Sequence, residues 1–174
     1  MRQPGINRHP ESFHISTGVC SYQQSLHACR LPYLESVAAS FNNFGSLSGS
    51  SQLSSLAPHI KILTLSHSNI SELPGNLGEV LPHLLELNVS SNSLSALPHS
   101  LFTHATKLTA LSFEHNSISI IPSTASQLQN LQQLFASDND IEELFDNMFD
   151  NMPRLQVCRP MQAGYSAFSE QALL

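Results

Sequence analysis

Charged residues are scarce in this chain. Only 11% of its 174 residues are Asp, Glu, Lys or Arg, whereas soluble domains carry roughly 25%. The 13 acidic residues outnumber the 7 basic ones, which gives a formal net charge of −6. A protein that grips nucleic acid through its phosphates needs clustered Lys and Arg. We therefore expect no nucleic-acid partner.

Cysteines and long apolar runs are also scarce. The three cysteines, Cys20, Cys29 and Cys158, are too few and too irregularly spaced for a disulfide framework or a metal site. The first residues read MRQPGINRHPESFHI and lack the apolar segment of a signal peptide. The longest apolar runs span only a few residues, far short of a transmembrane helix. We therefore expect a cytoplasmic protein with no membrane span, no metal and no cofactor.

A repeated pattern of apolar residues and asparagine accounts for most of the chain. Four segments follow L-x-x-L-x-L-x-x-N-x-L-x-x-L with substitutions, and they start at Ile60, Leu84, Leu108 and Leu131. Successive starts are therefore 24, 24 and 23 residues apart. Self-similarity at a fixed period of this length is typical of solenoid proteins, in which each repeat packs on its neighbours.

Less regular copies extend the pattern in both directions. A weaker copy starts at Leu34, 26 residues before the first regular one, and a partial copy starts at Leu155 and then loses the pattern. A fainter copy around Phe13 to Cys20 fits the spacing, but the sequence leaves it open whether these residues form a repeat or only a flank.

The pattern resembles the leucine-rich-repeat superfamily, in the form with 23–24 residues per repeat and Leu-Pro after the repeated block. The resemblance covers about Leu31 to Leu155. It implies an α/β solenoid (a horseshoe) with a parallel sheet on the concave side and short helices or irregular turns on the convex side. We expect an N-terminal flank, cap or degenerate repeat over 1–30, the array over 31–158, and a C-terminal tail or cap over 159–174.

The apolar positions predict which side chains form the core. We expect parallel strands near 62–66, 86–90, 110–114 and 133–137, joined by right-handed crossovers. Strand residues that should point inward are Leu63, Leu65, Leu87, Val89, Leu111, Phe113, Leu134 and Ala136. After the turn, Ile70, Leu94, Ile118 and Ile141 should do the same. The convex side should bury Leu77, Leu81, Leu101, Phe102, Leu128, Met148, Phe149 and Met152.

An asparagine follows each strand. In the leucine-rich-repeat superfamily this side chain hydrogen-bonds the backbone of adjacent turns, which leaves no buried polar group unpaired. The resemblance implies a structural ladder of Asn42, Asn92, Asn116 and Asn139. The copy that starts at Ile60 has Ser68 in this place, so we expect a looser turn there.

The outward strand positions predict a small, polar face with a few apolar points. We expect a protein or peptide to dock on it. The predicted contact residues are Phe41, Ile62, Thr64, His67, Glu86, Asn88, Ser112, Glu114, His115, Gln133, Phe135 and Asp138. Phe135 is expected to face solvent and anchor the partner, because exposed aromatic residues are enriched among binding hot spots. The alternative is that Phe135 packs on its neighbours and covers the end of the array.

Two groupings on this face have residue types that could carry chemistry. Ser91, His115 and Asp138 stand in one column on consecutive repeats and are the residue types of a nucleophilic triad. An open sheet offers neither a pocket nor an oxyanion hole, so we interpret the row as a hydrogen-bonded ladder. His67 and His115 lie two repeats apart, roughly 10 Å, which is too far for both to bind one zinc ion.

We therefore predict a non-catalytic, monomeric interaction module: a scaffold, adaptor or regulatory subunit that binds a protein or peptide on the concave face. The alternative is a fragment of a larger leucine-rich-repeat receptor or receptor kinase, whose effector domain lies outside this chain.

Overall fold

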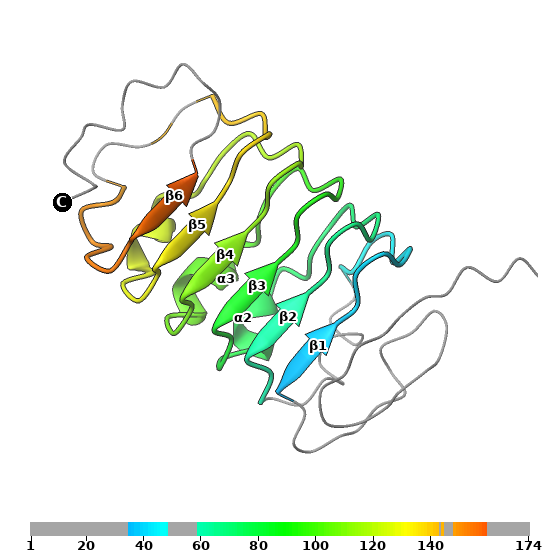
Figure 1. Cartoon of the computed structure of the whole chain (residues 1–174), viewed down its shortest axis with the longest axis horizontal. Helices are drawn as coiled ribbons and strands as arrows, with labels where there is room; N and C mark the ends of the chain where they lie inside the picture. Colours follow the sequence, from blue (N-terminus) through cyan, green and yellow to red (C-terminus); the bar gives the residue numbers. More distant parts are fainter. Residues whose placement is uncertain (1–34, 49–58, 143, 145–147, 160–174) are drawn as a thin grey trace, which may run out of the picture.

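The computed structural model describes residues 35–48, 59–142, 144 and 148–159. Six short strands in this part form one sheet, in chain order and parallel throughout (Figure 1). The strands are β1 (Ser36–Ala38), β2 (Ile62–Thr64), β3 (Glu86–Asn88), β4 (Ala110–Ser112), β5 (Gln133–Phe135) and β6 (Val157–Arg159). The predicted parallel solenoid is confirmed. The predicted flanks, 1–30 and 159–174, lie outside the described residues except for Arg159, as does the faint copy around Phe13 to Cys20.

The strands begin where the repeat predicts but are two residues shorter. They end early, yet the pairing between repeats continues past their ends. The backbone N–H of Leu65 donates to the Asn88 carbonyl at 2.8 Å, and that of His67 donates to the Ser90 carbonyl at 3.1 Å. The irregular copies that start at Leu34 and Leu155 also form strands in register with the others, β1 and β6.

The core lies between the sheet and the convex segments. All twelve predicted inward residues are buried, at 6% exposure or less. The convex layer contains α2 (Leu77–Val80), α3 (His99–His104) and the 3-10 helix η2 (Ser123–Gln127). The eight apolar side chains predicted for the convex side are buried, except Phe149, which is only partly buried against the core. No repeat could bury this surface alone, so each depends on its neighbours for stability.

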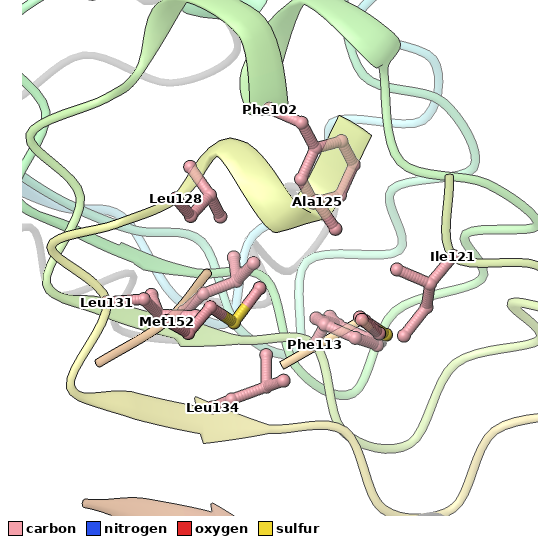
Figure 2. A pocket seen from close by; sticks show the side chains of 10 residues that line it. Phe102, Phe113, Ile121, Ala125, Leu128, Leu131, Leu134 and Met152 are labelled. Atoms are coloured by element: carbon pink, nitrogen blue, oxygen red, sulfur yellow. The ribbon is translucent and has the colours of Figure 1, made fainter. Parts of the chain in front are cut away.

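The interior holds little empty space. A cavity between the fourth and fifth strands and the convex layer has a volume of about 10 Å³ and is lined only by apolar side chains, among them Phe102, Leu134 and Met152 (Figure 2). Ligand pockets usually enclose about 300–1,000 Å³. This cavity is a packing defect, far too small to hold a ligand.

The asparagine ladder joins consecutive repeats. The Asn92 carbonyl oxygen accepts from the N–H groups of Ser68 and Ile70, each at 3.0 Å, and its amide donates to Leu65, Val89 and Ser90 carbonyls. Asn116 and Asn139 bond the adjoining turns in the same manner. Among the described residues, the Asn42 amide donates only to the Ala39 and Ser40 carbonyls of its own turn. The ladder that the resemblance implies is therefore present at Asn92, Asn116 and Asn139.

Ser68 replaces asparagine without leaving its turn open. It is fully buried, and its hydroxyl lies 3.1 Å from the Ala39 carbonyl of the preceding repeat. A serine lacks the amide oxygen that would accept the N–H of Phe44, and the backbone carbonyl of Ser68 accepts it instead at 3.0 Å. The expectation of a looser turn is wrong, because the shorter side chain lets backbone atoms meet directly.

Removing the ladder amide at Asn116 should destabilise the array. Asn116 is 9% exposed, and it holds the Leu94 N–H and the Val89 and Phe113 carbonyls. Asn116→Ala would orphan these groups and is expected to cost about 1–3 kcal/mol. Urea denaturation measures the loss. Asn130→Ala is the control, because Asn130 makes one exposed bond to the Thr106 carbonyl, and equal midpoints for the two variants would contradict the role of the ladder.

Candidate binding face

Strand alternation directs a second set of side chains away from the core. Because successive residues point to opposite faces of a sheet, the residues between the inward ones form four columns across the repeats. Those of the first three are Ser36, Ile62, Glu86, Ala110 and Gln133, then Ala38, Thr64, Asn88, Ser112 and Phe135, then Ser40, Ser66, Ser90, Glu114 and Ser137. The fourth holds Phe41, His67, Ser91, His115 and Asp138. None of these residues is buried.

This concave face brings together all twelve predicted contact residues. It lies opposite the helices α2 and α3, which cover the other side of the sheet (Figure 1). No described segment crosses it, so its backbone and side chains meet solvent over β1 to β5. The geometry therefore provides a continuous surface for a partner.

The fourth column has an unusual backbone conformation. Phe41, His67, Ser91, His115 and Asp138 all have positive φ, between 53° and 60°. This left-handed conformation is uncommon for residues other than glycine, although His and Asp adopt it more readily than most. Each repeat has it at the same place, after the strand and one residue before the ladder position. The consequence is a row of outward side chains along one rim of the concave face.

An exposed aromatic pair stands at one end of this row. The rings of Phe41 and His67 stack with centroids 4.7 Å apart and planes 3° from parallel, while Phe41 is 71% exposed. Stacking explains why these two rings lie together. Most of the Phe41 ring nevertheless stays exposed. An exposed aromatic surface of this kind is the usual form of a hot spot for protein binding.

At the other end of the row, His115 and Asp138 form a polar pair. His115 Nδ1 lies 3.3 Å from Asp138 Oδ2, and both side chains are about 60% exposed, so the contact contributes little to stability. Among the described residues, no hydrogen bond joins Ser91 to His115. The contact between His115 and Asp138 is an ion-pair distance and not a hydrogen bond. The predicted hydrogen-bonded ladder is therefore wrong for these three residues, and the arrangement is not a nucleophilic triad.

Polar side chains of the third column contact polar side chains of the neighbouring repeats, in the third column or, for Ser90, in the second. The hydroxyls of Ser40 and Ser66 lie 2.9 Å apart, and those of Ser90 and Ser112 lie 2.6 Å apart. Farther along, the Ser137 hydroxyl donates to Glu114 Oε1 at 2.6 Å. These contacts bridge neighbouring repeats and set side-chain positions before any partner arrives.

Phe135 does not face solvent as expected. It is partly buried, because β4 and β6 flank its strand and place Ser112 and Arg159 opposite it in register. Phe135 is less exposed than predicted because the partial copy at Leu155 forms a full neighbouring strand. The alternative that Phe135 packs on its neighbours agrees with this, but Phe135 does not cover the end of the array, because β6 lies beyond it. Phe41, at 71% exposed, presents the larger aromatic surface.

Other kinds of site were sought in the described part of the chain. No three His, Cys, Asp or Glu side chains there lie close enough together to hold a metal ion. No helix in these ranges is long and apolar enough to cross a membrane.

Comparison with known proteins agrees with the geometry. Residues 58–118 and 82–141 match the family described as leucine rich repeat, whose domains usually bind proteins and are usually not catalytic. No catalytic family is identified. No functionally curated protein matches the chain in sequence.

Several solved structures have the same fold. The Arabidopsis receptor kinase HAESA, in complex with the peptide hormone IDA and the co-receptor SERK1, matches with 29% identity and a TM-score of 0.68 over 75% of this chain. A leucine-rich-repeat protein of Leptospira interrogans matches with 27% identity and a TM-score of 0.65 over 72%. An internalin of Listeria monocytogenes, at 23% identity and a TM-score of 0.57 over 71%, shares the fold.

The chain spans only part of each of these proteins: 22% of the HAESA chain, 31% of the Leptospira protein and 34% of the internalin. The residues of this chain that match the family also have the repeat period, the parallel sheet and the asparagine ladder. The chain belongs to the leucine-rich-repeat superfamily.

Proposed function

We propose that this array is a non-catalytic interaction module, a scaffold, adaptor or regulatory subunit that binds a protein or peptide segment across its concave face. The observation that carries the proposal is the exposed Phe41–His67 pair at the end of a mostly polar face that no described segment crosses. An aromatic anchor surrounded by adaptable polar groups is typical of surfaces that recognise other proteins.

The dimensions of the face favour an extended segment. Strands in a sheet lie about 4.8 Å apart, so the five intervals between β1 and β6 span about 24 Å. An extended peptide advances about 3.3–3.6 Å per residue, so about seven residues would cross the array. The open face has no enclosed pocket of the kind that buries a small molecule. A peptide or protein edge therefore fits better than a metabolite.

A second candidate is that the array is the recognition part of a larger receptor, with its effector domain outside this chain. Two observations support it: the chain spans between 22% and 34% of the structures it resembles, and one of these is a receptor kinase bound to a peptide hormone. The full-length transcript distinguishes the candidates, because only a receptor would encode a membrane or effector segment in the same reading frame.

For the first candidate, the interaction module, we also propose a cytoplasmic location and a monomeric state. Fluorescence microscopy of the tagged full-length gene product would test the location. Light scattering on the purified chain would test the monomer.

Site-specific photo-crosslinking would test the binding face. A photoreactive phenylalanine analogue replaces Thr64 or Ser112 on the concave face, or the exposed Gln129 on the convex side as a control. We expect both concave positions to crosslink to the same protein, identified by mass spectrometry, and Gln129 to give none of that product. A partner crosslinked only from Gln129 would place the binding site on the convex side.

A further inference from the structure

The Lys and Arg side chains that the structure describes gather at one edge of the array. Every Lys or Arg whose side chain the structure describes, Lys61, Lys107 and Arg154, lies in the turn that precedes a strand. These turns meet the tail ends of the strand arrows in Figure 1. Of the nine carboxylates in the same described part, only Glu35 belongs to such a turn. The edge is therefore basic, although the chain as a whole carries a net charge of −6.

Four side chains of this edge form a row, which we call the basic row: His59, His83, Lys107 and Arg154. The first three occupy the same position in consecutive repeats, 24 residues apart, and Asn130 separates Lys107 from Arg154. The rings of His59 and His83 are parallel with centroids 6.5 Å apart, and Lys107 Nζ lies 3.0 Å from Nδ1 of His83. All four side chains are exposed.

The cations of the basic row lack acidic partners in the described part of the chain. Lys61, on the same edge, pairs with Glu35 at 2.6 Å. Lys107 instead contacts an imidazole, and Arg154 makes no ion pair with any described carboxylate, including the nearby Asp150. Charges arranged in this way attract and orient an oppositely charged partner.

We propose that the basic row docks an acidic peptide segment that runs along this edge, across the strands. The row extends over four repeat intervals, about 19 Å, which matches about six residues of extended chain. Alternate side chains of such a chain recur every roughly 6.6 Å on one side, close to the 6.5 Å between the two imidazole centroids. Carboxylates of Asp or Glu at alternate positions would accept hydrogen bonds from the imidazole N–H groups, the ammonium and the guanidinium. This surface is distinct from the concave face, and the proposal does not depend on the function proposed for that face.

Fluorescence anisotropy with a labelled hexaglutamate peptide tests the proposal on the full 174-residue chain. Low salt, about 50 mM, keeps surface charges from being screened. We expect the Lys107→Gln/Arg154→Gln double variant to bind about three- to tenfold more weakly than wild type, since exposed ion pairs each contribute modestly. The control is Ser95→Asp/Ser119→Asp, two exposed positions beyond the strands, which changes net charge by the same −2. It should bind within about twofold of wild type.

Three results would overturn the proposal. One is the absence of measurable binding to wild type. Another is an equal loss in the two double variants, because the effect would then come from net charge alone. The third is that a labelled hexathymidine oligonucleotide binds more tightly than hexaglutamate and is weakened to the same extent by the Lys107→Gln/Arg154→Gln double substitution. The edge would then be a site for phosphates. Phe41→Ser, which alters the concave face, should leave hexaglutamate binding unchanged, so the two proposals can fail separately. Circular dichroism confirms that each variant is folded.

Discussion

Leu111→Ala is expected to lower the free energy of unfolding by about 2–5 kcal/mol. Leu111 is 1% exposed and stands in register between Leu87 and Leu134. It also lines the small apolar cavity, so truncation would enlarge a space that already exists. Repeats on both sides hold the surrounding side chains in place, and incomplete collapse of the site makes the cost large.

Chemical denaturation followed by circular dichroism measures this effect. Ile120→Ala is the matched control, because Ile120 is 70% exposed and loses little buried contact when truncated. Its free energy of unfolding should change by no more than about 0.5 kcal/mol. Similar stabilities for the two variants would mean that the leucine columns are not the core.

Gly78→Ala is expected to destabilise the array by about 3 kcal/mol, the upper part of the range for overpacking. Gly78 is buried in α2, and a Cβ built there would lie 2.1 Å from the backbone carbonyl oxygen of Ser100 in the next repeat. Alanine in a helix is more stable than glycine by about 0.5–1 kcal/mol. This gain does not offset the clash, because the clashing atom belongs to the backbone and a side-chain rotation cannot relieve it. Moving α2 away from α3 would also break the bond from the Gly78 N–H to the Ser100 hydroxyl.

Gly75→Ala is the control, because it makes the same substitution at a position with free space around it. A Cβ at Gly75 would meet nothing within 4 Å, so this variant should keep wild-type stability or gain a few tenths of a kcal/mol. Thermal unfolding compares the two. A Gly78→Ala protein as stable as Gly75→Ala would show that α2 and α3 do not pack as closely as described.

The core was predictable because it depends on a local, repeated pattern. Leu63, Leu87 and Leu111 recur at one spacing, and a repeat can bury such residues only by stacking on the next. The concave face followed from the same alternation, since residues between inward leucines must point the other way. Both predictions require only that consecutive repeats in the chain pack on one another.

Features that depend on contacts between particular repeats could not be predicted. The closeness of Gly78 to Ser100 results from how α2 packs on α3, and nothing in the repeat pattern marks that glycine. Ser68 was misjudged because its own backbone carbonyl replaces the missing amide oxygen. Phe135 is less exposed than expected because the partial copy at Leu155 forms β6 beside its strand, and the repeat pattern does not show how much of Phe135 that strand covers. The shared period of His59, His83 and Lys107 was visible in the sequence, but a mutual contact between their side chains was not.

One comparison of dissociation constants tests most directly whether the concave face binds the partner. The partner identified by crosslinking is titrated with wild type, Thr64→Arg and the convex control Gln129→Arg. Thr64 lies in β2 with its side chain on the concave face, so a long charged side chain there would obstruct a docked segment. We expect Thr64→Arg to weaken binding at least about tenfold and Gln129→Arg to stay within about twofold of wild type. Wild-type affinity for Thr64→Arg, with a loss in Gln129→Arg, would contradict binding on the concave face.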